Sequence, residues 1–282
     1  MIFLSGDPAL LMLPPEATSE DVEAFRESHG FNDPFLVQYG RFIKNAMRGD
    51  LGRSLRFNEP ALDMVLERLP ATLQLSFFSM LLATLIAIPL GTFAALKRNS
   101  VIDYSASVVA VIGQSIPNYW LGFLLVIFFA VELRLLPTSG GPGLKYAILP
   151  AATIAIAVTA LITRMTRSSI LEVLSEDYVR TARAKGLQEY WVIIKHVLRN
   201  AIIPIITVIA LQFGYILGGA VVIETIFVWP GLGLLTVQAI YMRDYPVVQA
   251  SVLFLSLSFV FINLSVDIAQ HYLDPRIRES NG

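Results

Sequence analysis

The chain has 282 residues, of which 55% are hydrophobic and 15% are charged. Soluble domains carry roughly 25% charged residues, so this composition indicates a membrane protein. A formal net charge of −1 argues against nucleic-acid binding. The absence of cysteine excludes disulfides, thiolate zinc sites and thiol nucleophiles. The sequence also contains no phosphate-binding loop, no metal-binding histidine spacing and no nucleophile elbow, so we expect no catalytic, cofactor or metal site.

The first seventy residues are polar and are predicted to form a small, mostly helical region. Ser19, followed by two acidic residues, is typical of a helix start, and Gly30 indicates where that helix ends. A second helix is expected to begin at Pro34, because proline is favoured in a first helical turn, and a third, short helix is expected at Pro60. We interpret residues 1–70 as an extracytoplasmic region that packs on the membrane domain, in preference to a ligand-binding site.

The sequence becomes strongly apolar from residue 71 onward, and residues 71–273 are predicted to form a transmembrane domain. A bilayer core of ~30 Å is crossed by ~20 apolar helical residues. Five stretches meet this requirement: residues 71–96, 101–131, 147–163, 201–223 and 247–270. A buried helix in a soluble protein keeps a polar face, whereas residues 71–96 contain no charge at all.

The stretch 101–131 is too long for a simple span and contains Pro117. It could be one tilted, kinked span or a hairpin of two spans. Treating it as one span places most Lys and Arg residues of the loops on the same side, including segment 164–199 and the tail 274–282. The positive-inside rule then favours five spans, with the N-terminal region outside and the C-terminus in the cytoplasm. Because an outside N-terminus needs a preceding span or a signal peptide, we expect that a first transmembrane helix is missing from this chain.

The segment 164–199 is predicted to be a cytoplasmic loop that contains two helices. One helix precedes Gly186, and the second covers Gln188 to Leu198. Gly186 permits a sharp turn between them, because glycine adopts the left-handed conformation at little cost. The pattern fits a rigid lever that enters a groove of a partner protein, but it also fits an ordinary amphipathic surface loop.

Several polar residues fall inside or next to the predicted spans. Gln114, Asn118 and Gln212 either line a solute pathway or form hydrogen bonds with neighbouring helices. Glu224 and Asp267 lie near span ends, where a charge can reach water, and we expect them to have structural roles. Gly214 and Gly218 form a GxxxG pattern that permits two helices to approach closely. Trp229, in the loop 225–246, belongs either to a re-entrant or gate element or to an interfacial aromatic belt.

The loop has a specific resemblance. The stretch from EDYVRTARAKGL (176–187) to HVLRNAIIP (196–204) resembles the EAA-type loop of ABC importer permeases, in particular the dipeptide/oligopeptide/nickel family. Further matching motifs follow one another along the chain: GDPA (6–9), GDLGRSL (49–55), ERLPATLQL (67–75), GQSIPNYWLG (113–122), LPTSG (136–140), VVIETIFVWPGLG (221–233), RDYPVVQ (243–249) and DPRIR (274–278). The resemblance covers essentially the whole chain and is closest to the B-type subunit, in which a first span lies just before GDPA.

The resemblance implies an all-α polytopic membrane protein with a type I ABC importer permease bundle, located in the cell inner membrane. It implies a heterodimer with a second permease, two cytoplasmic ATPase subunits that bind ATP and magnesium, and an extracytoplasmic binding protein that delivers peptides or similar solutes. The chain itself would have no enzymatic activity and no cofactor.

The resemblance also assigns the contact with the ATPase to one segment. Its members are Tyr178, Arg180, Thr181, Ala182, Arg183, Ala184, Lys185 and Gly186. Tyr178, Ala182 and Ala184 are expected to pack in the groove of the ATPase, and the three basic residues are expected to meet acidic groups at its rim. Gly186 sets the turn. The family's general EAA pattern has a glutamate where this chain has Arg180, so the role of that position is the least well supported.

Other classes of protein fit the sequence less well. An ATP-independent carrier or channel usually has paired intramembrane charges or an inverted repeat, and neither is found here. An intramembrane enzyme would need two catalytic groups at one depth. The solute itself stays open, because peptide, nickel-chelate and glutathione systems share this scaffold.

Overall fold

The computed structural model describes residues 9, 13, 16–28, 30–139 and 143–273. The expected tail 274–282, residues 6–8 of the GDPA motif and the end of LPTSG lie outside the described residues, as does the side chain of Asp267. Within the described part, the regular secondary structure is helical and is accompanied by one isolated bridge between Arg53 and Pro60. The chain divides into two compact units, one formed by residues 1–71 and 230–255 and the other by residues 72–229 and 256–282.

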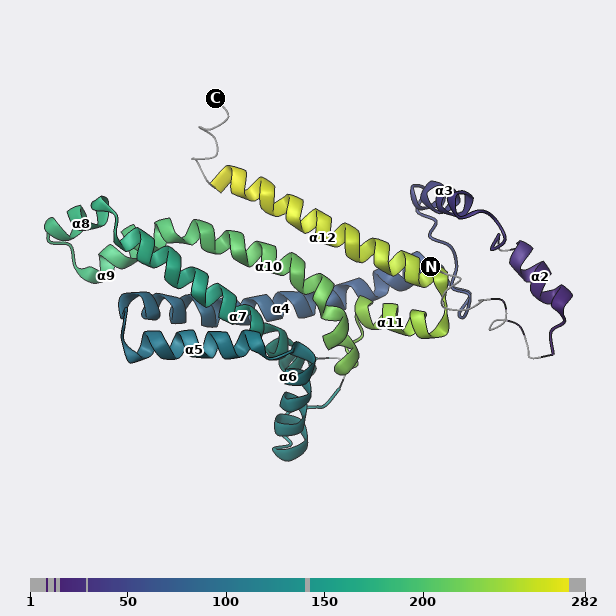
Figure 1. Ribbon diagram of the computed structural model, residues 1–282, viewed down its shortest axis with the longest axis horizontal. Helices are drawn as coiled ribbons and strands as arrows, with labels where there is room; N and C mark the ends of the chain where they lie inside the picture. Colours follow the sequence, from purple (N-terminus) through teal and green to yellow (C-terminus); the bar gives the residue numbers. More distant parts are fainter. Residues whose placement is uncertain (1–8, 10–12, 14–15, 29, 140–142, 274–282) are drawn as a thin grey trace, which may run out of the picture. The chain divides into compact units, whose positions relative to one another are not determined.

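The first unit contains α2 (Ser19–Ser28), α3 (Phe35–Ala46), α11 (Leu232–Met242) and the first turns of α4 and α12. Figure 1 labels these helices. The core of this unit consists of Leu51, Ala61, Val65, Leu232, Leu235, Ala239, Val247 and Ala250. Each fully buried side chain of leucine size contributes about 1.5–3 kcal/mol, so this core is what joins two segments that are distant in the sequence.

Helix α2 begins one residue earlier than the sequence suggested. Thr18, not Ser19, is its cap: the Thr18 hydroxyl accepts a hydrogen bond from the Asp21 amide (3.3 Å) and donates one to the Asp21 carboxylate (2.7 Å). This reciprocal pairing satisfies amide groups that have no partner inside the helix. The hydrogen bond from the Thr18 side chain lowers the pKa of Asp21 below its ordinary value.

A buried carboxylate joins two of the sequence motifs within the first unit. Asp244 of RDYPVVQ is buried; it accepts a hydrogen bond from the hydroxyl of Ser54 and one from the amide of Leu55 (3.1 Å). Ser54 and Leu55 belong to GDLGRSL. A buried charge is tolerated only when it is hydrogen-bonded, and the two motifs supply the partners.

The short third helix expected at Pro60 does not exist as a separate element. Helix α4 runs without interruption from Ala61 to Leu96. The boundary at residue 70 was placed where the sequence becomes apolar, but the backbone hydrogen bonds of a helix do not depend on side-chain polarity. The helix therefore continues through this change in composition.

The second unit contains most of the predicted membrane domain. Its helices are α4 (Ala61–Leu96) from residue 72, α5 (Val101–Ser115), α6 (Asn118–Leu125), the π-helical η2 (Val126–Glu132), α7 (Leu144–Leu174), α8 (Asp177–Ala184), α9 (Glu189–Trp191), the π-helical η3 (Val192–Leu198), α10 (Arg199–Ile226) and α12 (Tyr245–Leu273) from residue 256. Helix α7 packs against both α5 and α10, and Figure 1 shows the three running alongside one another.

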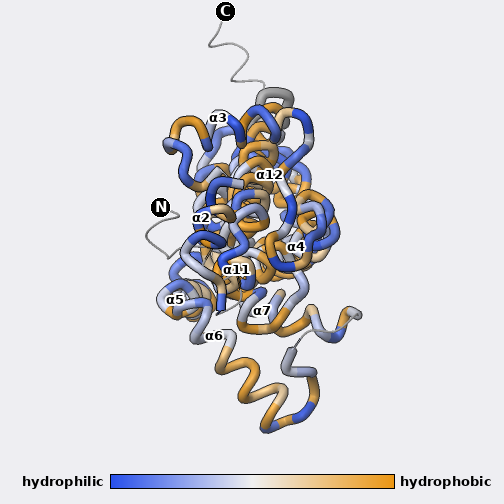
Figure 2. Tube along the Cα trace, turned by 90° about the vertical axis from the view of Figure 1, so that its right-hand side faces the viewer, coloured by the Kyte–Doolittle hydropathy of each residue, from blue (hydrophilic) through white to orange (hydrophobic). Residues whose placement is uncertain are grey.

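Four described helices are long and apolar enough to cross a membrane: α4, α7, the continuous segment from Glu189 to Ile226, and α12. The pair of α5 and α6–η2 makes a fifth crossing if it counts as one span. This pair is bent by 101°, with the break at Pro117. Figure 2 shows hydrophobic colouring over most of α6 and its continuation. The break follows from the chemistry of proline, which lacks an amide hydrogen and excludes the preceding residue from the helical region.

The predicted cytoplasmic loop is more helical than the sequence suggested. Helix α7 continues to Leu174, well beyond the expected end of its span at residue 163. The second predicted helix of the loop is present but does not end at Leu198; it passes directly into α10. The irregular part of the loop is thereby reduced to the two short turns around α8.

Candidate functional site

A polar cavity of about 500 Å³ lies among four helices of the second unit. Gln114 comes from the end of α5, Asn118 from the start of α6 and Gln212 from the middle of α10, and all three line the cavity. Ala157 and Leu161 of α7 complete its wall. The structure therefore brings together the three residues predicted to line a pathway.

The helix break at Pro117 explains why two of these residues meet. Gln114 precedes the break and Asn118 follows it, so the 101° bend places the end of α5 and the first turn of α6 on the same cavity. At membrane depth, a broken helix is tolerated only where it is buried in protein or lines a cavity that admits water. The location of the break is consistent with a cavity that holds a polar solute.

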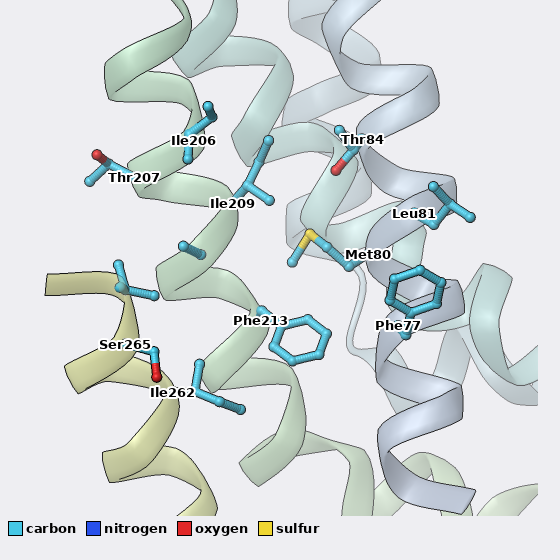
Figure 3. A pocket seen from close by; sticks show the side chains of 12 residues that line it. Phe77, Met80, Leu81, Thr84, Ile206, Thr207, Ile209, Phe213, Ile262 and Ser265 are labelled. Atoms are coloured by element: carbon cyan, nitrogen blue, oxygen red, sulfur yellow. The ribbon is translucent and has the colours of Figure 1, made fainter. Parts of the chain in front are cut away.

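A second cavity, shown in Figure 3, has a different character. It has a volume of about 460 Å³ and lies between α4, α10 and α12. Phe77 and Met80 line one side, and Phe213 and Ile262 lie opposite them. The hydroxyl of Ser265 donates to the carbonyl of Phe261 in its own helix (2.7 Å), so it adds little polarity to the cavity.

Helix α10 separates these two cavities. Ile206, Ala210 and Phe213 face the apolar cavity, whereas Gln212 and Tyr215 face the polar one. At about 100° per residue, the two sets occupy different faces of one helix. The polar cavity is therefore the candidate for solute passage.

The two glycines of the GxxxG pattern in α10 have different surroundings. A Cβ atom at Gly214 would lie 3.5 Å from the side chain of Asn263 and 3.6 Å from that of Phe259, both on α12. At Gly218, an added Cβ would meet no atom of the described chain within 4 Å. The contacts at Gly214 are ordinary van der Waals distances, so a Cβ atom would fit at either position within this chain.

The predicted coupling segment forms α8 and the turn that follows it. Val179 and Ala182 are buried, because their spacing of three residues places both on the face of α8 that packs against η3. The expectation that Ala182 packs in a partner's groove is wrong for this reason: its side chain faces its own chain. Tyr178, Thr181 and Lys185 share another face of α8, and all three are exposed.

Gly186 has φ +78°, the left-handed conformation that the turn prediction requires. The amide of Gly186 donates to the carbonyl of Arg183 (2.9 Å), and the amide of Leu187 donates to the carbonyl of Ala182 (3.4 Å). These two bonds form a Schellman motif, which satisfies the last carbonyl groups of the helix. The turn is therefore defined by backbone geometry.

Two of the three basic residues of this segment, Arg180 and Arg183, have acidic partners within the chain. Arg183 forms a bidentate ion pair with Glu189 across the turn, at 3.1 Å from Nε and 2.6 Å from Nη2. The hydrogen bond to Glu189 raises the pKa of Arg183 above its ordinary value. Arg180 lies 3.5 Å from Asp177, but both are largely exposed, so this pair contributes little.

The sequence prediction missed an exposed apolar group next to the turn. Leu187, Tyr190 and Trp191 are all about half exposed, and the rings of Tyr190 and Trp191 pack edge to face, 5.4 Å apart. Adjacent aromatic residues directly after a glycine turn could have indicated this group. It adds exposed apolar surface after the turn.

The structure corrects the expectation for Glu224, in the last turn of α10, and excludes one of the two alternatives for Trp229, which follows α10. Glu224 does not reach water: its residue is fully buried, and Thr72 donates a hydrogen bond to its carboxylate (2.6 Å). Trp229 is 4% exposed, so within this chain it is a core residue and does not belong to an exposed aromatic belt. A carboxylate inside a helical bundle needs a hydrogen-bond donor, and Thr72 of α4 supplies one.

Among the described residues, no group of three His, Asp or Glu side chains could hold a metal ion. The candidate site therefore consists of neutral polar side chains around a cavity, together with the exposed turn after α8. Neither feature carries acid–base or nucleophilic chemistry.

Comparison with known proteins places these features in a family. Residues 87–279 match the family described as binding-protein-dependent transport system inner membrane component. Over 275 residues the chain is 46% identical to the glutathione transport system permease protein GsiC of Escherichia coli (strain K12), covering 98% of this chain and 90% of the relative. The GsiC protein of Shigella dysenteriae serotype 1 (strain Sd197) is similar to the same extent.

Solved structures with the same fold are membrane components of ABC transporters. A chain of the MetNI methionine ABC transporter, solved in inward facing conformations, aligns with a TM-score of 0.65 at 17% identity and covers 75% of this chain and 96% of that chain. An amino acid ABC transporter with histidines gives 0.58 at 15% identity, covering 74% and 94%. The predicted all-α polytopic fold of a type I importer permease is confirmed. The chain belongs to the inner membrane components of binding-protein-dependent transport systems and is a permease of an ABC importer.

Proposed function

We propose that the chain forms half of the pathway by which an ABC importer takes up peptides or similarly polar small solutes. The observation that carries this proposal is the convergence of Gln114, Asn118 and Gln212 on one cavity. Amide side chains both donate and accept hydrogen bonds, which suits the amide groups of a peptide. The cavity volume falls within the ~300–1,000 Å³ that is usual for small-molecule sites.

The proposed partners are a second permease, two cytoplasmic ATPase subunits and an extracytoplasmic solute-binding protein. The second permease would close the open side of the polar cavity. The N-terminal region would lie outside, and the C-terminus in the cytoplasm. The relative GsiC is named for glutathione transport, which supports a peptide-like solute.

Coupling to ATP hydrolysis is proposed to use the exposed face of α8. Tyr178, Thr181 and Lys185 would contact the ATPase, and Gly186 would fix the direction in which α8 points. Because Arg183 pairs with Glu189, its role would be to stiffen the turn rather than to contact acidic groups at the rim of the ATPase groove. Closure of the two ATPase subunits would then move α8 as a rigid body.

The test replaces Gln212 with leucine and measures uptake of labelled peptide by the complete transporter in proteoliposomes. The expected result is a loss of tenfold or more in uptake, with assembly of the complex unchanged. Thr207→Leu is the matched control, because Thr207 lies on the same helix but lines the apolar cavity. Equal uptake by both variants would contradict the assignment of the polar cavity.

A further inference from the structure

Helices α5 and α7 contact each other at two positions along α5. At one end of α5, a Cβ atom on Gly113 would lie 3.6 Å from Ile156 and 3.9 Å from Ala160, both on α7. At the other end, Asp103 of α5 pairs with Arg167 of α7. The two contacts are about 15 Å apart along α5, at 1.5 Å per residue. The helices therefore contact each other over most of the length of α5.

The ion pair is the more specific of the two contacts. Arg167 Nε lies 2.5 Å from one Asp103 carboxylate oxygen, and Nη2 lies 2.8 Å from the other. The side chain of Asp103 is 4% exposed and that of Arg167 is 30% exposed. A bidentate pair of this kind fixes orientation as well as distance, and it is shielded from water on the Asp103 side.

Asp103 also organises the turn between α4 and α5. Its carboxylate accepts the amide of Asn99 (3.0 Å), and its own amide donates to the side chain of Ser100, which caps α5. Asn99 adopts φ +61°, a left-handed conformation. Asp103 thus holds the turn and Arg167 through its carboxylate and the start of α5 through its amide.

Helix α4 approaches α7 at the adjacent position. A Cβ atom on Gly91 would lie 2.6 Å from the Cβ of Thr166 and 2.7 Å from the carbonyl of Thr163. No other residue type fits here without movement of a backbone. Helices α4 and α5 are therefore both fixed to the same short stretch of α7.

The contacts of α4 and α5 with α7 lie between α8 and the polar cavity along the chain of packed helices. Arg167 lies about two turns before the end of α7, which is followed by α8 after two residues. At its far end α5 carries Gln114, which lines the polar cavity. A displacement of α8 reaches Gln114 through α7, the ion pair and α5.

We propose that Asp103 and Arg167 are positioning residues for transport: their ion pair makes α5 follow α7 when the ATPase moves α8, so that the polar cavity changes shape with each ATP hydrolysis cycle. The inference rests on the proposed function of α8 as the coupling helix. Without the pair, α7 would move while α5 and Gln114 stayed behind, and ATP would be hydrolysed with little uptake.

The test uses the complete transporter in proteoliposomes and measures ATP hydrolysis, uptake per ATP hydrolysed and melting temperature. Arg167→Gln and Asp103→Asn are expected to keep ATP hydrolysis within about twofold of the parent and to lower uptake per ATP by tenfold or more. Arg167→Lys keeps the charge but loses the bidentate geometry, so its uptake per ATP is expected to lie between that of the parent and that of Arg167→Gln. Arg164→Gln is the matched control, since Arg164 is an exposed arginine on the same helix.

An unchanged uptake per ATP in Arg167→Gln or Arg167→Lys, with only a lower melting temperature, would assign the pair a purely structural role and overturn the inference. A cysteine at Thr181 that crosslinks to the ATPase separates this failure from failure of the proposed function. If the Thr181→Cys crosslink forms but uptake per ATP is unaffected by the ion-pair variants, only the inference fails. If the crosslink does not form in the Thr181→Cys variant with Asp103 and Arg167 intact, the coupling role of α8 fails.

Discussion

Replacing Gly186 by valine tests whether the turn after α8 transmits force. Gly186 has φ +78°, and an added Cβ would meet no atom of the described chain within 4 Å. The penalty is therefore one of backbone conformation, about 1–2 kcal/mol for a residue with a Cβ atom in the left-handed region. A difference of that size changes the population of the native turn by a factor of about 5–30.

The consequence for transport follows from this population. Valine is β-branched and should disfavour the turn most, alanine should have a smaller effect, and asparagine should have the least, because asparagine tolerates the left-handed conformation. The order of uptake per ATP hydrolysed should be glycine, asparagine, alanine and valine. The assay is peptide uptake and phosphate release by the reconstituted transporter, with melting temperature as the control for folding.

The reasoning would be refuted if Gly186→Val transported at the parental rate per ATP. It would also be refuted if asparagine and valine had equal effects, because then the left-handed conformation would not be the cause.

Three further predictions concern packing and buried charge. Gly91→Ala should destabilise the purified protein by about 1–3 kcal/mol, because the new Cβ overlaps with α7. Gly218→Ala should leave the melting temperature unchanged or raise it, since its Cβ meets open space. Equal shifts in melting temperature for the two variants would contradict the packing. Asp244→Asn should lower stability by about 1–3 kcal/mol through its hydrogen bonds to Ser54 and Leu55, and an unchanged thermal melt would refute this. Arg183→Gln should cost less than about 1 kcal/mol, since the pair with Glu189 is partly exposed, and chemical denaturation measures it.

The sequence predicted those features that depend on local chemistry. Pro117 predicted a bend, and Gly186 predicted a left-handed turn; both follow from the backbone preferences of the residue itself. The apolar stretches predicted the membrane helices for the same reason, since length and hydropathy are local properties.

Features that depend on tertiary packing were predicted less well. The family resemblance assigned Ala182 to the contact with the ATPase, but Ala182 packs against η3, because the neighbouring helix decides which face of α8 is buried. The end of the polar region was drawn by composition, although α4 continues through it. The pair of Asp103 and Arg167 was missed because the two residues are 64 positions apart, and no local pattern links charges on different helices.

The candidate pathway was predicted in part from local chemistry and depends in part on tertiary packing. Gln114, Asn118 and Gln212 could be singled out as polar residues within apolar stretches. That they line one cavity depends on the 101° bend and on the packing of α10 against α7. Sequence alone therefore identified the members of the site but not their proximity.

The most direct test of the account is the location of the turn after α8 relative to the membrane. The chain contains no cysteine, so Lys185→Cys provides a single exposed thiol, and a membrane-impermeant maleimide can be applied to sealed vesicles of either orientation. The account predicts labelling only in inverted vesicles, where the cytoplasmic face is outward, and protection when the ATPase subunits are bound. Labelling in right-side-out vesicles would place the turn outside the cell, beyond the reach of any ATPase, and would contradict the account.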